Sequence, residues 1–435
     1  MRIFHFVPSL QKPARGRTEN PDKGFIFEPR SQTNARVTNN NNNETAMKNF
    51  IYSQPTRIVF GEGTHREIGK HLQSVSRRVL LHYGSASAVK SGLIDRTKLA
   101  LEQAGIYYRE LGGVQPNPRL SLVREGIGIV RSEGLDAILA VGGGSVIDSA
   151  KAIGMGAVYP GDVWDFFQGT AVPQACLPIA TVLTIPAAGS EASDSCVITD
   201  ERGPFKKGIH SSLVRPTLSI LDPTLTYTLP AYQTAAGGTD IMAHVMERYF
   251  TNEQDVDLTD RLCEAVLQTI VANLPRALAD PRDYAARAQM MWASSLAHND
   301  LLSTGRTGDW ASHAIAHQPS ALYDLTHGAA LAIIFPAWMR HVYRHDTARF
   351  VRFAVRVWGI EQDVFHPERT ALQGIERTEA FFAACGMPTR FSQAGIPDER
   401  FGEMADRATS NGTLTLGHFV PLTREDIFRI YCSAR

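Results

Sequence analysis

The stretch DAILAVGGGSVIDSAK, residues 136–151, contains the pattern that decides the fold of this chain. It begins with an apolar run as long as one strand, passes through three glycines and ends in a segment with helical spacing. The runs RRVLLHYG, IATVLTIP and LSILDP are also apolar on both faces, as buried parallel strands are. Helical stretches alternate with these runs, so residues 47–227 are predicted to form an α/β domain with a mainly parallel sheet.

The rest of the chain follows a different pattern. From residue 229 onward the strand-like runs disappear, and long helical segments follow with Pro and Gly at their joints. This pattern predicts an all-α domain at residues 228–435. The full length of 435 residues is enough for two sizeable cores.

The composition excludes several classes of partner. Lys plus Arg and Asp plus Glu both number 44, and no basic block stands out, which argues against nucleic acid and anionic membranes. The longest apolar run, residues 329–339, is too short to cross a bilayer and contains Pro336. The five cysteines are scattered and never form a Cys-x-x-Cys pair. We therefore expect a soluble, cytoplasmic protein with reduced thiols.

The first 46 residues differ from all that follows. They hold scattered Pro, Arg and Asn, including the asparagine run 39–43, and no sustained apolar period, so they are predicted to be a disordered extension. Their basic start is followed by no apolar region long enough for a secretory signal. An organelle-targeting segment stays open. So does an artefact of start-site choice, because Met47 opens a convincing domain start, MKNFIYSQPTRIVFGEG.

Five residues of the helical half carry the chemistry of a metal site. Asp240 and His244 stand four apart in GGTDIMAH, His313 and His317 stand four apart in GDWASHAIAH, and His327 ends LYDLTH. Residues four apart share one face of a helix. Imidazoles with one carboxylate suit a divalent transition metal such as zinc or ferrous iron. A lone Asp-x-x-x-His is usually a surface or capping pair, so the prediction depends on the whole set.

The glycine turn at the end of the strand in residues 136–142 could hold a phosphate. Gly143 and Gly144 would let the backbone approach an anion closely, and the helix that follows offers free N–H groups. The spacing is not the standard Gly-x-Gly-x-x-Gly fingerprint. A tight turn with Ser145 as the helix cap therefore stays open. A second polar turn, residues 184–193, would place Thr184 and Ser190 at the same sheet edge.

Taken together, these segments resemble the iron-containing (group III) alcohol dehydrogenase family, in its butanol dehydrogenase and NADPH-dependent aldehyde reductase branch. The resemblance runs from about Met47 to the C-terminus through ordered motifs: PTRIVFGEG, GGVQPNP, VGGGSVIDSAK, LTIPAAGSEAS, LDPTLTYTLP, GGTDIMAHVMERY, GDWASHAIAH and DLTHGAA. It implies a Rossmann-like sheet domain followed by an all-α domain, in a dehydroquinate synthase-like architecture.

The resemblance also implies roles for the metal-site residues. The family's ligands, one Asp and three His, match Asp240, His244, His313 and His327. His317 matches a histidine beside the nicotinamide that is not a ligand, and it is the expected catalytic residue. The family holds iron in some members and zinc in others, so both Fe²⁺ and Zn²⁺ are expected candidates.

Cofactor-binding residues are likewise implied by the resemblance. They are Gly84, Ser85, Ser87, Gly143, Gly144, Ser145, Thr184, Ser193 and Lys206. Of these, Ser193 departs from the Asn-type residue of relatives, and Lys206 matches a lysine near the nicotinamide ribose. Some members hold the adenosine ribose with an Asp after the strand that matches RVLLHYG. The turn here, YGSAS at residues 83–87, has no acid, which favours NADP(H) over NAD(H).

The expected activity is interconversion of primary alcohols and aldehydes of butanol-like size. The metal would act as a Lewis acid on the substrate oxygen, and hydride would pass to or from the nicotinamide. A homodimer is expected from the resemblance. The alternatives are a dehydroquinate synthase-like lyase, a glycerol dehydrogenase-like enzyme and a non-catalytic nucleotide-binding protein. No cluster of basic residues for a phosphorylated acid lies near the ligands, which argues against the lyase.

Other polar residues near these motifs are expected to have ordinary roles. His82 and His298 are predicted to be common polar or surface residues. Glu247 and Arg248 are predicted to form a solvated charged face of their helix, and Asp309 to cap the helix that carries His313.

Overall fold

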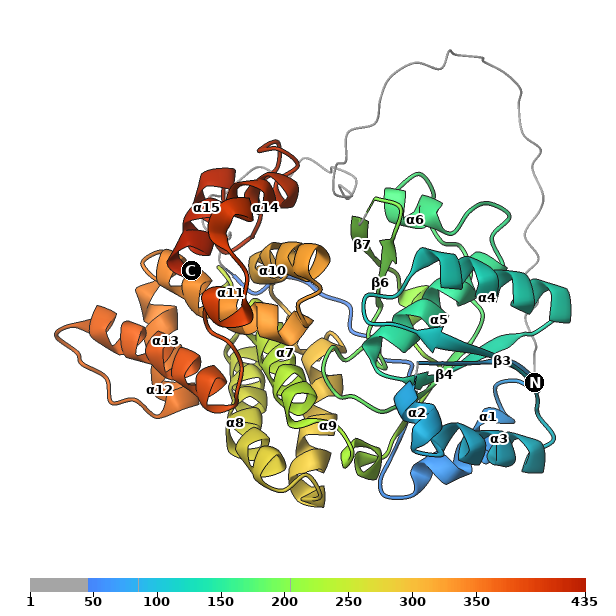
Figure 1. The fold of residues 1–435 in the computed structure, drawn as a ribbon. Coiled ribbons are helices and arrows are strands. Elements are labelled where there is room, and N and C mark those ends of the chain that lie inside the picture. The colour runs from blue at the N-terminus through green and yellow to red at the C-terminus, as the bar shows by residue number, and fades with distance from the viewer. Residues whose placement is uncertain (1–45, 85, 204) are drawn as a thin grey trace, which may run out of the picture. The chain divides into compact units, whose positions relative to one another are not determined.

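The computed structural model describes residues 46–84, 86–203 and 205–435 (Figure 1). Apart from residue 46, the predicted disordered extension lies outside these residues. Within them, six strands form one parallel sheet in the order β1-β8-β5-β4-β2-β3, which confirms the mainly parallel sheet. The strands are β1 (Arg57–Phe60), β2 (Arg78–Gly84), β3 (Tyr107–Val114), β4 (Ala137–Gly142), β5 (Ile179–Leu183) and β8 (Leu218–Leu221).

Helices cover both faces of this sheet, because alternate residues of each strand point to opposite sides and both sides are apolar. Leu80 and its neighbours in the sheet pack with α4, α5 and α6, whereas Val79 and Leu81 pack with α1 and α3. The helices of this half are α1 (Ile68–Leu72), α2 (Ala86–Lys90), α3 (Leu93–Gln103), α4 (Leu120–Glu133), α5 (Gly144–Ala157) and α6 (Trp164–Gln168), with the short 3-10 helices η1 (Thr64–Glu67), η2 (Ser212–Val214) and η3 (Pro223–Thr226).

A separate antiparallel hairpin was not foreseen from the sequence. Its strands β6 (Ser195–Asp200) and β7 (Phe205–His210) pair outside the parallel sheet, and β6 packs on α5. The strand sequences SCVITD and FKKGIH mix polar and apolar residues without the continuous apolar run of the buried strands. This hairpin matters for the site because β7 contacts the helix that carries His313.

His82 is fully buried in β2, so its assignment as a common polar or surface residue is wrong. Its Nδ1–H donates to the Leu111 carbonyl at 2.8 Å, and the Ser149 hydroxyl donates to its Nε2 at 2.8 Å. Both ring nitrogens are therefore satisfied by the neutral imidazole. Burial lowers the pKa of His82 to about 4, although the bond to the carbonyl favours the charged form.

This burial predicts a pH dependence of stability. The folded pKa of about 4 lies below the ordinary value of 6.5, so the unfolded chain binds a proton at His82 at a higher pH than the folded protein does. The full stability is therefore present above pH 6.5, and it is lost as the pH falls from 6.5 through 4. The loss is about 3 kcal/mol. Urea unfolding of metal-free protein between pH 7 and 4 measures it. We expect the free energy of unfolding to fall less steeply with acid in His82→Gln; equal slopes would contradict this role.

The helical half confirms the predicted all-α architecture. Its central element is α7, whose residues from Thr234 to Tyr249 are all buried. Its helices are α7 (Ala231–Tyr249), α8 (Asp257–Ala279), α9 (Tyr284–His298), α10 (Ala311–Tyr323), α11 (His327–Val342), α12 (Thr347–Trp358), α13 (Pro367–Ala384), α14 (Phe401–Ala408) and α15 (Arg424–Ser433), with the 3-10 helices η4 (Leu301–Ser303), η5 (Ser392–Ala394) and η6 (Asp398–Arg400). No described helix is long and apolar enough to span a membrane.

A proline inside α10 is accommodated by the last helix of the chain. Pro319 has no N–H to donate to the carbonyl of Ile315, four residues earlier. The hydroxyl of Tyr431 in α15 donates to that carbonyl instead, at 2.8 Å, and Tyr431 is fully buried. A buried backbone acceptor left without a partner would cost about 1–3 kcal/mol, so this bond stabilises the helix that carries His313.

Candidate active site

Three strand ends meet at one edge of the sheet and bring most predicted cofactor residues together. Gly84 ends β2, Gly143 and Gly144 follow β4, and Thr184 follows β5. The Thr184 N–H donates to the Gly142 carbonyl at 3.0 Å, so these two turns are in direct contact. Carboxyl ends of parallel strands are where ligands of open α/β sheets bind. Ser85 and the side chain of Ser87 lie outside what the structure describes.

The glycine turn opens α5 without a side-chain cap. Gly143 is the N-cap residue, and no side-chain hydrogen bond caps the helix, so the alternative of Ser145 as cap is wrong. A Cβ at Gly142 would lie 2.4 Å from Val146 Cγ2, and one at Gly143 would lie 3.1 Å from Ile185 Cβ. Glycine is thus required for close packing here, and the first N–H groups of α5 are available to an anion.

Two other predicted cofactor residues lie nearby in different surroundings. Ser193 is fully buried, and its hydroxyl bonds to the Lys151 ammonium at 3.3 Å and to Ser195 Oγ at 3.2 Å. Lys206, on β7, donates to Asn117 Oδ1 at 3.1 Å. Burial lowers the pKa of Lys206, although the charge of Asp240 favours the ammonium. Lys206 therefore faces the helical half, whereas Ser193 belongs to a buried network beneath the cofactor edge.

Three of the four expected metal ligands converge from three different helices. Asp240 lies in α7, His313 in α10, and His327 is the first residue of α11. Asp240 Oδ1 lies 3.8 Å from His313 Nε2 and 4.0 Å from His327 Nε2. One ligand atom from each residue lies within 4.8 Å of the other two, and no other group of this kind is found among the described residues.

The fourth expected ligand, His244, lies beside this group and is not part of it. Its ring centroid is 4.5 Å from that of His313. Its Nδ1–H donates to the Asp240 carbonyl at 2.9 Å, one helical turn earlier, so Nε2 keeps the lone pair that a metal would need. His317 is also outside the group, with its ring centroid 5.4 Å from that of His327.

The donor atoms of this group fit a divalent cation. Asp240 Oδ1 and His313 Nε2 are buried and have no hydrogen-bond partner. Burial would raise the pKa of Asp240, but the neighbouring His244, His313 and Lys206 outweigh it and lower the pKa, so the carboxylate stays ionised. Burial lowers the pKa values of His313 and His327 well below the ordinary value, which keeps the imidazoles neutral. An anionic oxygen and neutral imidazole nitrogens are the donors that Zn²⁺ and Fe²⁺ accept.

Residues expected on a solvated helix face are instead buried around this group. Glu247 and Arg248 are at most 2% exposed, so the prediction of a charged surface is wrong. The reason is that α7 lies inside the helical half, where every one of its residues from Thr234 onward is buried. Burial raises the pKa of Glu247 to about 7, against the N–H groups of His313 and Trp310, which lower it.

Arg248 connects the His244 backbone to the buried His298 side chain. Its guanidinium donates to the His244 carbonyl at 2.8 Å and to His298 Nδ1 at 3.3 Å, and it lies 4.6 Å from the centre of the Trp310 ring. His298 is buried, contrary to its expected surface position, and its Nε2–H donates to Ser195 Oγ at 3.2 Å. A continuous chain of polar contacts thus runs from the His244 carbonyl through Arg248 and His298 to Ser195 of the β6–β7 hairpin.

Asp309 is not the N-cap residue of α10, which is Trp310, but it contacts the start of this helix from the preceding position. One of its oxygens accepts from the Ala311 N–H at the start of α10, at 3.3 Å, and the other accepts from the N–H groups of His418 and Phe419, both at 2.8 Å. Burial raises the pKa of Asp309 to about 7. The residue therefore joins α10 to the chain segment before α15.

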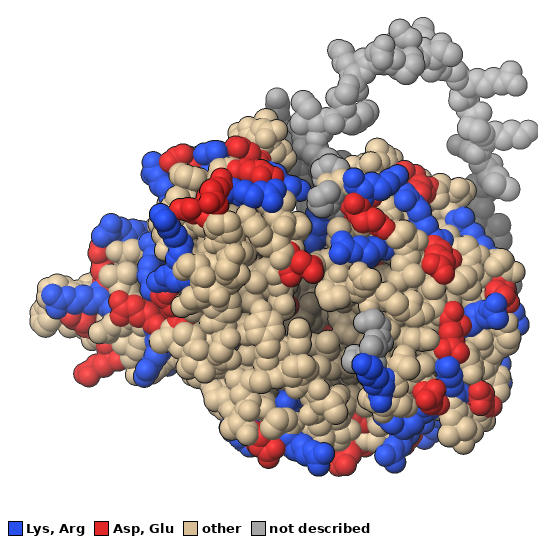
Figure 2. All heavy atoms as spheres, in the orientation of Figure 1, with Lys and Arg blue, Asp and Glu red and all other residues tan. Residues whose placement is uncertain are grey.

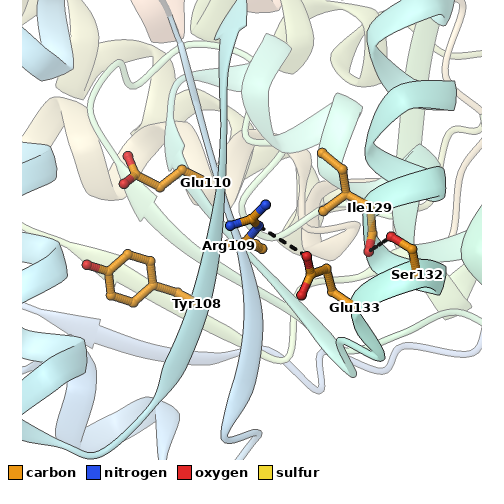
Figure 3. A pocket seen from close by; sticks show the side chains of 6 residues that line it. All are labelled: Tyr108, Arg109, Glu110, Ile129, Ser132 and Glu133. Carbon is orange, nitrogen blue, oxygen red and sulfur yellow. Dashed lines mark hydrogen bonds and ion pairs between the residues drawn. The ribbon is translucent and has the colours of Figure 1, made fainter.

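A hollow between β3 and α4 lies apart from the predicted metal and cofactor residues. It measures about 530 Å³ and is lined by Tyr108, Arg109, Glu110, Ile129, Ser132 and Glu133 (Figure 3). Arg109 and Glu133 pair across it at 3.3 Å, and it contains none of the predicted site residues.

On the face drawn in Figure 2, basic and acidic side chains are interspersed, in keeping with a formal net charge of zero.

A parallel sheet with a glycine turn at the start of α5, joined to helices that gather Asp and His donor atoms, is typical of an enzyme that uses a nucleotide and a metal. Residues 55–223 match the family model for iron-containing alcohol dehydrogenase, and residues 234–435 match that for the C-terminal part of the same family. The chain belongs to the iron-containing alcohol dehydrogenase family. The predicted family, enzyme class and fold are thereby confirmed.

Relatives cover nearly the whole described chain. A probable NADH-dependent butanol dehydrogenase 1 of Bacillus subtilis (strain 168) is 42% identical over 88% of this chain and 99% of its own length. The NADPH-dependent aldehyde reductase YqhD of Escherichia coli (strain K12) is 35% identical over 89% and 100%. The structure of NADH-dependent butanol dehydrogenase A from Thermotoga maritima superposes with a TM-score of 0.86 at 40% identity, covering 89% of this chain and 99% of that one.

Proposed function

We propose that this enzyme reduces short-chain aldehydes to primary alcohols, and oxidises the alcohols in reverse, at a divalent metal ion. The observation that carries the proposal is the convergence of the Asp240 carboxylate with His313 and His327, whose donor atoms lie within 4.8 Å of one another. The names of the relatives, butanol dehydrogenase and aldehyde reductase, support substrates of butanol-like size.

Four residues would hold the ion, which is Fe²⁺ or Zn²⁺: Asp240, His244, His313 and His327. When bound, the ion supplies Lewis acidity at the substrate oxygen, and the nicotinamide supplies or accepts the hydride. The ionised Asp240 would offset part of the cation's charge, and the neutral imidazoles leave a net charge near +1 beside the substrate. His317, four residues from His313 on the same helix face, would exchange the proton of the substrate hydroxyl at a ring nitrogen.

The cofactor would lie along the sheet edge. Its pyrophosphate is expected at Gly143, Gly144 and Ser145, where α5 begins, and its nicotinamide ribose near Lys206, which the Asn117 side chain holds. Gly84, Ser85, Ser87, Thr184 and Ser193 remain predicted cofactor residues. Of these, Ser193 would support the cofactor site through its contacts with Lys151 and Ser195, because its side chain is fully buried.

We further propose NADP(H) as the preferred form of the cofactor. The support is the turn YGSAS after β2, which has no acid to hold the adenosine ribose and repel a 2′-phosphate. NAD(H) is the alternative, favoured by four relatives of 40–42% identity that carry NADH in their names. The relative with NADPH in its name is 35% identical.

Assembly and location complete the proposal. A homodimer is supported by the apolar side chains exposed just before the edge strand β1, of which Ile51 is 98% exposed and Phe50 51%. A cytoplasmic location is supported by the cysteines, all five of which are free thiols.

The experiment that tests this function follows nicotinamide absorbance with butyraldehyde. Chelated protein is expected to lose activity by about a hundredfold or more, and Fe²⁺ or Zn²⁺ to restore it. Parallel assays with NADPH and NADH determine which cofactor has the higher kcat/KM. Full activity after complete metal removal would contradict the metal-dependent mechanism, and absence of turnover with a range of aldehydes despite bound metal and cofactor would contradict the reductase assignment.

A further inference from the structure

A buried carboxylate connects two of the helices that carry metal ligands. We propose that Glu247 of α7 is a positioning residue for the metal centre, which orients the imidazole of His313; this inference rests on the proposed function. Sequence reasoning missed Glu247. Its signal is the spacing Asp240, His244, Glu247, at intervals of four and three residues, which places all three on one face of α7.

The Glu247 carboxylate makes three hydrogen bonds, all to residues at the start of α10. Its Oε1 accepts from the backbone N–H of His313 at 2.9 Å and from the ring Nδ1–H of His313 at 2.8 Å. Its Oε2 accepts from the N–H of Trp310, the N-cap residue of α10, at 2.6 Å. The side chain of Glu247 is 0% exposed, so no water competes for these bonds.

The bond to the ring decides which nitrogen of His313 is available. Because an ionised carboxylate only accepts, the ionised form of Glu247 places the ring proton on Nδ1 and leaves the lone pair on Nε2. Nε2 is the atom that lies 3.8 Å from Asp240 Oδ1 and has no hydrogen-bond partner. A carboxylate bonded to the outer nitrogen of a metal-binding histidine also raises the basicity of the ligand and fixes the plane of its ring.

The same carboxylate fixes the spacing of the two helices. A negative charge at the N-terminus of α10 is favourable because the backbone N–H groups there carry partial positive charge. The Asp309 N–H also donates to the Glu247 carbonyl at 2.8 Å, which adds a backbone connection at the same place. Glu247 thus fixes the position of α10, which carries His313, relative to α7, which carries Asp240.

A helix cap alone would need only the backbone bonds to Trp310 and His313. The additional bond to the His313 ring is the one that orients the imidazole. It leads to a separate prediction about metal affinity. Removing a partner of this kind typically weakens metal affinity by about 10- to 100-fold. A residue that only capped α10 would leave the metal affinity of the folded protein unchanged.

The test measures Zn²⁺ affinity of the purified protein by competition with a chromophoric chelator. Glu247→Ala, which loses all three bonds, is expected to bind Zn²⁺ about 100-fold more weakly than the wild type. Glu247→Gln is expected to bind about 10-fold more weakly, since its amide oxygen still accepts from His313 but the charge is lost. Thermal unfolding of the metal-free variants, measured alongside, reports the separate loss of the cap.

The matched control is Glu264→Gln. Glu264 is also a buried glutamate of the helical half, and its partners are the Tyr249 hydroxyl at 3.0 Å and the Arg352 guanidinium at 2.7 Å. The Zn²⁺ affinity of the Glu264→Gln variant is expected to stay within about twofold of that of the wild type. Equal affinity of Glu247→Ala and the wild type would overturn the inference and leave the proposed function intact. A wild type that binds no metal would overturn the proposed centre itself.

A measurement on the unmodified protein covers the case in which the variants do not fold. Nitrogen NMR of metal-free, ¹⁵N-histidine-labelled protein distinguishes the two neutral forms of each imidazole. We expect the His313 signal to show the proton on Nδ1 and a bare Nε2. The opposite form would show that the Glu247 carboxylate does not receive the ring proton, which would overturn the inference.

Discussion

Replacing His313 with alanine is expected to lower the kcat for butyraldehyde reduction by roughly a thousandfold. His313 lies between the other donors, with its Nε2 3.8 Å from Asp240 Oδ1 and its ring centroid 5.3 Å from that of His327. Loss of Lewis acidity is worth several kcal/mol in the transition state, and about 4 kcal/mol corresponds to a thousandfold. Steady-state kinetics with saturating Zn²⁺ or Fe²⁺ measure the change.

The substitution also leaves the buried Glu247 without the ring that it accepts from, so a loss of stability of about 1–3 kcal/mol is expected as well. Circular dichroism and thermal unfolding therefore accompany the kinetics. His366→Ala is the matched control, because the side chain of His366 is 58% exposed and pairs with Asp363 near the start of α13. A His313→Ala enzyme that retained a tenth of the wild-type rate would show that the metal centre does not depend on His313.

Replacing Gly328 with alanine is expected to lower kcat/KM by about a hundredfold without touching a ligand. Gly328 follows His327 at the start of α11 and lies against α7. A Cβ at this position would lie 2.1 Å from the backbone oxygen of Ala236 and 2.7 Å from its carbonyl carbon. Backbone atoms cannot rotate away as a side chain can, so α11 must shift and carry His327 away from Asp240.

Misplacement of a catalytic group by about 1 Å can cost a hundredfold in rate, and overpacking costs about 1–3 kcal/mol of stability. Gly128→Ala is the control, since Gly128 is also a helical glycine, in α4, but a Cβ there meets nothing within 4 Å. Its activity is expected to be unchanged and its helix slightly more stable. If Gly328→Ala retained full activity, the tight contact between α7 and α11 would not set the position of His327. Metal content of both variants, measured by elemental analysis, shows whether the rate and the ligand geometry change together.

The parts of the fold that sequence predicted well are those where local pattern and burial agree. The apolar runs around Leu80 and Ile138 are buried on both faces, and the pattern already says so. The β6–β7 hairpin was missed because its strands lie outside the parallel sheet, with β6 against α5, and its residues carry no continuous apolar run.

The parts of the site that sequence could not supply depend on contacts between helices. Helical spacing places Asp240 and His244 on one face of α7, but it does not reveal that a whole helix is buried. For this reason local pattern predicts surface positions for His298, Glu247 and Arg248, although each of them is buried. Arg248 bonds to His298 across 50 residues of chain and Glu247 bonds to His313 across 66, which are separations that no local pattern reports.

The hydroxyl of Tyr431 has a consequence for how the enzyme is made. During synthesis the helix with His313 and His317 leaves the ribosome before the residue that satisfies its free carbonyl at Ile315, which is 116 residues further along. At about 5–20 residues per second, this interval lasts roughly 6–23 s. The nascent chain thus carries the helix with His313 and His317 without this stabilising bond for the whole of that interval.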